Sequence, residues 1–325
     1  MFKRAFAVAF ALIGVFILAS PASADDYPSR TVTIVVPYPA GGPTDQAARQ
    51  IAQSLSQQLK QNFIVEDITG GGTIIATNHV AKAAPDGYTL LMHNLQISAN
   101  VTLYKKLPFD TEKDLTTVML INRNPLVLVG RKDLEANSLE QLIALMKKKT
   151  LRAAIPGYGA TGHLATTLLA QLAKVKLLQV PYRGAAPALV DILGGHVDIF
   201  FSTPQAVVKQ IAAGQMKAYG ITSKETSPLF PKVESFVKVF GPKMEFHYWQ
   251  ALFAPAKTPP AVIAKLNAAL QKTVQDPKLL KLWAATGVEP FPKAERTTAA
   301  GNAMLKSEIA RWGAVIRDNN IHVNQ

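Results

Sequence analysis

Short apolar runs alternate along this chain with longer segments whose apolar residues recur at helical spacing. The first run, 31–36, is continuous and rich in β-branched residues, which is typical of a buried parallel strand. After a break rich in proline and glycine, Ile51, Leu55 and Leu59 follow at four-residue spacing and predict an amphipathic helix. Further strands are predicted at 62–66 and 88–92, each after a helix. This βαβαβ order indicates a parallel sheet with right-handed crossovers.

The rest of the chain repeats this order. Apolar runs predict further strands at 117–121, 126–130, 151–155, 177–181, 197–201 and 216–221. From residue 249 a strand-like run and C-terminal helices complete the pattern. We therefore expect an α/β fold built as two lobes, each offering a strand, a glycine-rich turn and a helix. A ligand would lie in the cleft between them, at the carboxyl ends of the strands.

Two glycine-rich turns are the candidate binding features. The first, 37–43, leads into a helix with Gly42 or Thr44 as its N-cap and Asp45 in its first turn. The second, 156–162, leads into a helix that has His163 near its start. Because the N-terminus of a helix carries unpaired N–H groups, each turn is a candidate anion site. A tight turn that binds nothing is the alternative, and the pattern alone leaves it open.

Common catalytic patterns are missing from the sequence. Gly157, Gly159 and Gly162 have the spacing of a dinucleotide fingerprint, but no acidic residue follows within 174–184. The sequence has no Gly-x-Ser-x-Gly elbow and no P-loop, and its six histidines do not have the spacing of metal ligands. We expect no catalytic residue, metal or cofactor. A secreted hydrolase-like α/β enzyme is therefore the weaker alternative to a binding protein.

The N-terminal segment predicts export. Lys3 and Arg4 precede an apolar run at 5–18 and an Ala-Ser-Ala triplet at 22–24, which is typical of a signal peptide cleaved after Ala24. A retained anchor is disfavoured because the run is shorter than the ~20 residues needed to cross a bilayer. We expect residues 1–24 to be removed and the mature chain to be exported.

Charge and cysteine content limit the partners further. The net charge is +13, or about +11 without the two basic residues of the signal segment, which favours anionic partners. The basic residues are scattered and no nucleic-acid-binding pattern accompanies them, so small anions are favoured over nucleic acid. The chain has no cysteine, which excludes disulfides, thiolate metal sites and a cysteine nucleophile.

Seven stretches together resemble the Bug (TctC-type) family of periplasmic solute-binding receptors for tripartite tricarboxylate transporters. These stretches are 37–49, 85–91, 103–110, 162–164, 180–188, 193–198 and 309–313. The resemblance covers essentially the whole mature chain in order. Three places depart from the sequence that is usual in the family. Glu66-Asp67-Ile68-Thr69-Gly70 stands where the family often has Glu-Asn-Arg-Pro-Gly before its second glycine cluster. Ala160 replaces a common serine, and His93-Asn94 replaces a run that is usually small.

The resemblance implies a type II periplasmic-binding-protein (venus-flytrap) fold. Domain 1 would comprise 25–124 and 249–325, and domain 2 would comprise 125–248. The protein would be a monomeric periplasmic receptor that captures a small organic carboxylate for the membrane permease subunits of the transporter. A receptor that serves a signalling kinase is an alternative that the sequence leaves open. The ligand-binding residues implied by the resemblance are Tyr38, Ala40, Gly41, Gly42, Thr44, Asp45, Asn94, Gly159, Ala160, Thr161, His163, Tyr182 and Asp198.

Overall fold

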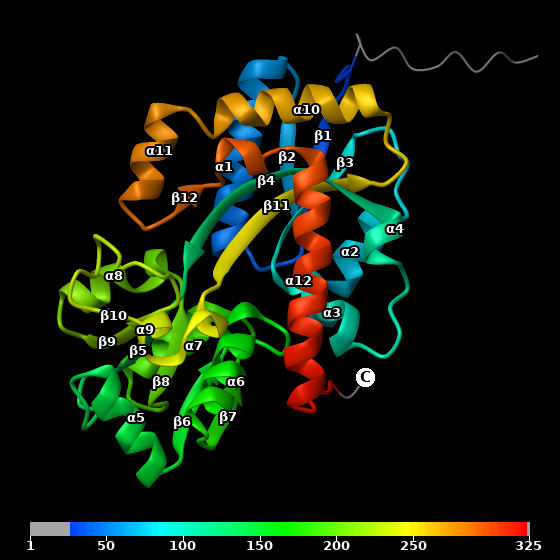
Figure 1. The fold of residues 1–325 in the computed structure, drawn as a ribbon. Coiled ribbons are helices and arrows are strands. Elements are labelled where there is room, and N and C mark those ends of the chain that lie inside the picture. Colours follow the sequence, from blue (N-terminus) through cyan, green and yellow to red (C-terminus); the bar gives the residue numbers. More distant parts are fainter. Residues whose placement is uncertain (1–26, 324–325) are drawn as a thin grey trace, which may run out of the picture.

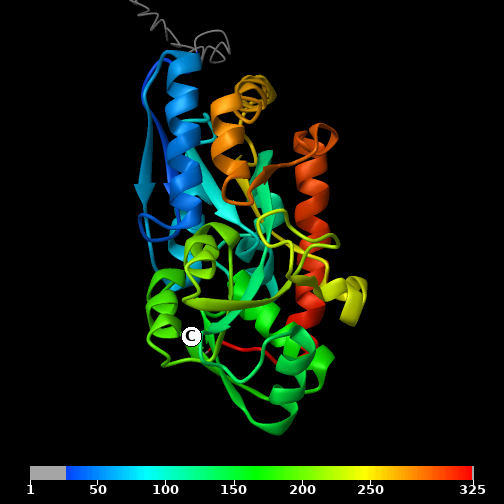
Figure 2. The ribbon, with the colours of Figure 1, turned by 90° about the vertical axis from the view of Figure 1, so that its left-hand side faces the viewer.

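The structure, a computed structural model, describes residues 27–323, which form two six-stranded sheets (Figure 1). The predicted signal peptide, 1–24, lies outside the described residues. Within the described part, every helix is too short or too polar to cross a membrane. Figure 2 shows the two sheets and their helices as two lobes, one above the other. The predicted α/β class with two lobes is confirmed.

The first lobe contains a mixed sheet with the strand order β12-β4-β11-β3-β1-β2. Its strands are β1 (Val32–Val36), β2 (Phe63–Asp67), β3 (Thr89–Asn94), β4 (Leu115–Pro125), β11 (His247–Pro255) and β12 (Glu289–Pro290). β1 pairs in parallel with β2 and β3, as predicted, whereas β11 is antiparallel to β3 and β4. β4 extends beyond the predicted 117–121 because β11 pairs with it along its whole length.

Helices cover both faces of this sheet. One layer is formed by α1 (Pro43–Leu59), α10 (Pro260–Thr273) and α11 (Pro277–Ala284), and the other by α2 (Ile74–Ala81), α3 (Gln96–Leu103) and α12 (Thr298–Asp318). The short elements of this lobe are α4 (Thr111–Asp114), η2 (Gly71–Thr73) and η4 (Lys293–Glu295). Adjacent β1 side chains enter opposite layers, since Ile34 belongs to the cluster of Ile51 and Val35 to the cluster of Trp312.

The second lobe contains a sheet with the order β10-β9-β5-β8-β6-β7. Its strands are β5 (Val127–Arg131), β6 (Leu151–Ile155), β7 (Leu177–Pro181), β8 (Ile199–Ser202), β9 (Met216–Ile221) and β10 (Glu234–Ser235). Its helices are α5 (Leu139–Lys148), α6 (Thr161–Ala173), α7 (Ala185–Leu193), α8 (Pro204–Ala212), α9 (Phe236–Phe240) and η3 (Pro242–Met244). β6 is parallel to β7 and β8, so the carboxyl ends of these three strands lie at one edge.

The chain crosses between the lobes at two adjacent points. β4 ends at Pro125 and β5 begins at Val127, and the chain returns through Phe246 into β11. The two crossings are tied by Thr222, whose Oγ1 accepts a hydrogen bond from the Leu126 N–H (2.9 Å) and donates one to the Phe246 carbonyl (2.7 Å). β4 and β11 run side by side toward this point (Figure 1). The expected domains, 25–124 with 249–325 and 125–248, stay a prediction that this change of sheet supports.

The lobes also touch where α12 of the first lobe reaches α6 of the second (Figure 1). At this place the Asn319 Nδ2 donates a hydrogen bond to the Gln171 Oε1 at 3.3 Å. One hydrophobic cluster spans both lobes and contains Leu103 of α3, Leu164 of α6 and Ile316 of α12. The lobes are therefore joined by packed side chains as well as by the two crossings.

Candidate functional site

A cavity of about 610 Å³ lies between the two lobes. Its lining comes from 38–44, 46, 94 and 96 of the first lobe, from 156, 160–162, 183–187, 189, 200–203, 205 and 206 of the second, and from Leu126 and Tyr248 at the crossings. Most of these residues end a strand or begin a helix, as the parallel arrangement predicts. The volume lies within the ~300–1,000 Å³ of typical small-molecule sites.

The wall of the first lobe is the glycine loop between β1 and α1. Gly41 adopts a φ of +80°, and its N–H donates to the Asp45 Oδ2 at 2.7 Å. Asp45 is buried and forms an ion pair with the Arg49 Nε at 2.7 Å. The Asp45 carboxylate therefore lies under the loop and holds its shape. In the first turn of α1, the N–H groups of Thr44 and Asp45 have no carbonyl partner within the helix.

The floor of the cavity is a buried polar cluster around Tyr248, in the strand where the chain re-enters the first lobe. The Tyr248 hydroxyl lies 2.8 Å from the Thr44 Oγ1 and accepts hydrogen bonds from the Asn94 Nδ2 (3.1 Å) and the Gln250 Nε2 (3.2 Å). Burial raises the pKa of Tyr248, so its hydroxyl stays protonated at neutral pH. This cluster fixes the side chains of three segments that are far apart in the sequence.

The wall of the second lobe is made by the first turns of α6, α7 and α8. Thr161, the first residue of α6, and Ser202, the last residue of β8, line the cavity, and their hydroxyl oxygens are buried. Neither hydroxyl has a hydrogen-bond partner among the described residues. Helix N-termini attract anions, and an unpaired buried hydroxyl has a donor available for a ligand. This wall is therefore suited to a carboxylate.

Charge in the cavity is limited to one side chain. Of the described residues that line it, Arg183 is the only one whose side chain is charged at neutral pH, and it is exposed at the start of α7. The described lining thus contains no pair of groups suited to general acid–base chemistry. The described residues also contain no group of three or more His, Asp or Glu side chains that could hold a metal ion.

The structure brings eight of the thirteen predicted site residues to the cavity. These are Tyr38, Ala40, Gly41, Gly42, Thr44, Asn94, Ala160 and Thr161. The other five lie outside its lining: Asp45, Gly159, His163, Tyr182 and Asp198. Asp45 lies behind the first glycine loop, as described above, and Gly159 faces α3 of the first lobe.

Asp198 and Tyr182 have partners within the second lobe. Asp198 accepts hydrogen bonds from the Arg131 Nε (3.0 Å) and the Arg152 Nη2 (3.1 Å), next to the first residue of β8 and thus at the end opposite the cavity. Burial alone would raise the pKa of Asp198, but the hydrogen bonds from Arg152 and Arg131 lower it. The Tyr182 hydroxyl donates to the Asp191 Oδ2 at 2.6 Å, and burial together with this carboxylate raises its pKa to about 12.

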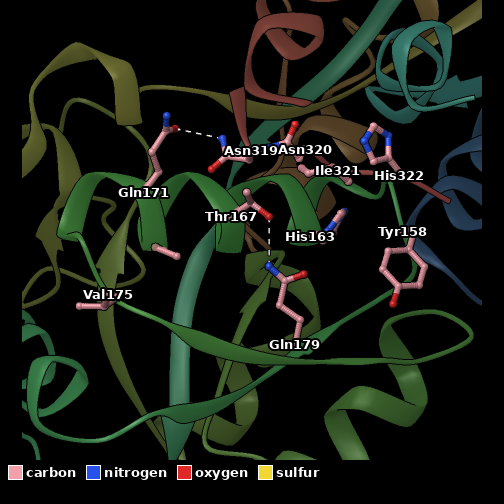
Figure 3. Close-up of a pocket in the computed structure, with 11 residues that line it drawn as sticks. Tyr158, His163, Thr167, Gln171, Val175, Gln179, Asn319, Asn320, Ile321 and His322 are labelled. Carbon is pink, nitrogen blue, oxygen red and sulfur yellow. Dashed lines mark hydrogen bonds between the residues drawn. The ribbon is translucent and has the colours of Figure 1, made fainter. Parts of the chain in front are cut away.

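His163 lines a second, smaller cavity of about 390 Å³ (Figure 3). Its Nδ1 accepts a hydrogen bond from the Gly159 N–H at 3.0 Å, and burial lowers its pKa to about 4, so the ring is neutral at pH 7. Figure 3 shows Tyr158 and His163 on one side of this cavity and the C-terminal residues 319–322 above them. His163 therefore supports the second glycine loop from behind.

Several lining residues were not predicted from the sequence. These are Gln46, Gln96, Leu126, Ser202, Thr203, Gln205 and Tyr248, among others. Ser202 and Thr203 had a detectable signal, because they follow a predicted strand and precede Pro204, a residue that suits the start of a helix. No sequence pattern predicted Tyr248, because its position at the floor of the cavity depends on the pairing of β11 with β3 and β4.

The chain is similar to proteins of one receptor family. The sequence model described as "Tripartite tricarboxylate transporter family receptor" matches residues 47–321. A UPF0065 protein of Agrobacterium vitis is 36% identical over 296 residues, which cover 90% of this chain and 86% of that protein.

Solved structures agree with this match. The periplasmic binding protein BugD has a TM-score of 0.84 and 32% identity, covering 91% of this chain and 100% of BugD. MatC from Rhodopseudomonas palustris, solved with bound malate, has a TM-score of 0.82 and 33% identity over 89% of this chain and 100% of its own. A further R. palustris protein, solved with adipate, has a TM-score of 0.84 and 30% identity over 92% of this chain and 100% of its own.

Proposed function

The chain belongs to the tripartite tricarboxylate transporter receptor family, and from that premise we propose that it captures a small organic carboxylate in the cavity between its lobes. Proteins of this family are solute-binding receptors and not enzymes. In our proposal the receptor acts as a monomer in the periplasm. It delivers its ligand to the membrane permease subunits of a tripartite tricarboxylate transporter.

The observation that supports the ligand class is a pair of unpartnered hydroxyls, that of Thr161 at the N-terminus of α6 and that of Ser202 at the end of β8. Thr161 Oγ1 and Ser202 Oγ are both buried at the cavity wall. Leaving a buried donor unpaired costs about 1–3 kcal/mol, so a ligand that accepts hydrogen bonds recovers this energy. A carboxylate accepts from both hydroxyls and also benefits from the positive end of the helix dipole.

The first lobe contacts the rest of the ligand in this proposal. The Gly41 N–H is already bonded to Asp45 and is not free for a ligand. The groups that remain for a ligand are the helix N–H groups of α1 and the cluster of Thr44, Asn94 and Tyr248, all polar and none positively charged. Such a lining can bind either the second carboxylate of a dicarboxylic acid or the hydroxyl of a short hydroxy acid. Malate and adipate in two relatives are ligands of this kind.

Titration calorimetry of the chain without residues 1–24 tests this proposal. Malate, adipate and a series of short mono- and dicarboxylates would be compared with glucose, a nucleotide and inorganic phosphate. We expect at least one carboxylate to bind, and mass spectrometry to recover it unchanged after incubation. Binding of glucose, a nucleotide or phosphate with no carboxylate bound, or conversion of the bound acid, would contradict the proposal.

A further inference from the structure

The glycine loop of the second lobe lies directly against α3 of the first lobe. Gly159 adopts a φ of +76° and faces this helix. A Cβ added at Gly159 would lie 2.5 Å from the Leu103 Cδ2 and 3.3 Å from the Asn100 Oδ1. Real Cβ atoms are essentially never found as close as 2.5 Å to another carbon, so a methyl group at residue 159 would force the end of the buried Leu103 side chain to move.

A hydrogen-bonded side chain lies beside this contact. The Gln96 Nε2 donates to the Tyr158 carbonyl of the second lobe (3.3 Å) and to the Gly72 carbonyl of the first (3.4 Å). The Gln96 Oε1 accepts a hydrogen bond from the Tyr38 hydroxyl at 3.3 Å. Gln96 is only 5% exposed and also lines the cavity. The Gln96 side-chain amide therefore bonds to both lobes and to Tyr38, a residue of the cavity wall.

The loop is held from its other side as well. The Gly159 N–H donates to the His163 Nδ1, and the Ala160 N–H donates to the Gly157 carbonyl at 3.3 Å. Ala160 and Thr161 follow directly and line the cavity. The position of this loop on α3 thus sets how the N-terminus of α6 faces the first lobe.

We propose that the loop 156–160 and α3 form an interlobe latch, in which Gly159 and Gln96 position the second lobe over the cavity. Gly159 does not line the cavity, so it acts on the ligand only through the closed arrangement of the lobes. A ligand that contacts both lobes binds this arrangement best, and a latch that populates it before binding raises the affinity. The role of the latch in affinity rests on the proposed function, whereas its role in lobe closure does not.

Two glycines of the same loop provide a matched pair of variants. Gly157 also has a positive φ, +118°, but an added Cβ there would meet only the Tyr182 carbonyl at 3.8 Å. Gly159→Ala and Gly157→Ala therefore both strain the backbone, and only the first variant obstructs α3.

The distance between the lobes is the ligand-independent readout. Because the chain has no cysteine, Gln53→Cys on α1 and Lys148→Cys on α5 accept spin labels without background labelling. Both side chains are exposed. In double electron–electron resonance without ligand, we expect a short-distance population that Gly159→Ala loses and Gly157→Ala keeps. Absence of that population, or its survival in Gly159→Ala, would overturn the latch.

A second change separates steric obstruction from misfolding. Leu103→Val removes the Cδ2 atom that a Cβ at residue 159 would strike, so the double variant should regain the short distance. If the double variant stays open while its circular dichroism matches that of the unchanged chain, the latch is refuted. For any carboxylate bound in calorimetry, Gly159→Ala should weaken affinity at least tenfold, mainly through faster dissociation. Loss of carboxylate binding altogether, with the distances as expected, would refute the proposed ligand and leave the latch standing.

Discussion

Thr161→Val gives the sharpest test of how the cavity binds its ligand. Thr161 is the first residue of α6, is 4% exposed, and its hydroxyl has no partner among the described residues. Valine has nearly the same shape but lacks the hydroxyl. The substitution therefore removes one hydrogen-bond donor from the cavity wall and leaves the packing of the helix in place.

The structure predicts opposite effects on stability and on affinity. Without ligand, the variant no longer buries an unpaired hydroxyl, so its free energy of unfolding should be unchanged or higher by about 1 kcal/mol. With ligand, it loses a hydrogen bond to a charged group, which contributes about 1.5–3 kcal/mol. The dissociation constant should therefore rise about ten- to a hundredfold. Urea unfolding and titration calorimetry measure the two quantities separately.

Thr167→Val is the matched control on the same helix. The Thr167 hydroxyl accepts a hydrogen bond from the Gln179 Nε2 at 3.1 Å and faces the smaller cavity (Figure 3). This variant should lose about 1 kcal/mol of stability and keep its affinity. An equal loss of affinity in both variants, or a destabilised Thr161→Val, would refute the reasoning.

Three further predictions concern buried polar groups. Tyr248→Phe removes the hydroxyl that accepts from Asn94 and Gln250 and leaves both amides only their longer contacts with the Thr44 Oγ1 (3.3 Å each), so it should lower the free energy of unfolding by about 1–3 kcal/mol in urea titrations. Asp45→Ala removes the acceptor of the Gly41 N–H and should weaken carboxylate binding in calorimetry because the first glycine loop loses its support. Burial lowers the pKa of His93 to about 3, below the ~6.5 of an unfolded histidine, so the unfolded state binds more protons between these values. The free energy of unfolding should thus fall by about 2 kcal/mol for this histidine as the pH drops from 7 to 5, and less steeply in a His93→Gln variant.

The strands and glycine turns could be predicted from the sequence because local chemistry determines them. A continuous β-branched run such as 31–36 suits a strand buried on both faces, and the prolines and glycines of 37–43 stop it. In a parallel sheet, strands that end at one edge carry their turns to the same place. Tyr38, Gly42 and Thr161 therefore reach one cavity although they lie in different lobes.

His163 and Asp198 show where the predicted site and the cavity lining differ. Successive residues of an α-helix are rotated by about 100°, so Thr161 and His163, two residues apart, face nearly opposite directions. Only Thr161 can face the cavity when the helix begins there. Asp198 immediately precedes β8, whereas Ser202 ends it, and only the carboxyl end of the strand lies at the cavity. The resemblance to a family implied Asp198, and no sequence prediction named Ser202, although it directly follows the predicted strand 197–201.

Asp45 explains why the two walls of the cavity differ. Its carboxylate takes the Gly41 N–H and pairs with Arg49, so the N-terminus of α1 already holds a negative charge supplied by the chain itself. A ligand carboxylate placed there would meet this charge, whereas the first turn of α6 contains no acidic residue and has two free hydroxyls beside it. We therefore propose that the second lobe is the stronger anion site and orients the ligand. In this proposal the neutral hydrogen-bond donors of the first lobe distinguish one acid from another by the hydrogen-bond acceptors on the part of the ligand that lies outside the anion site.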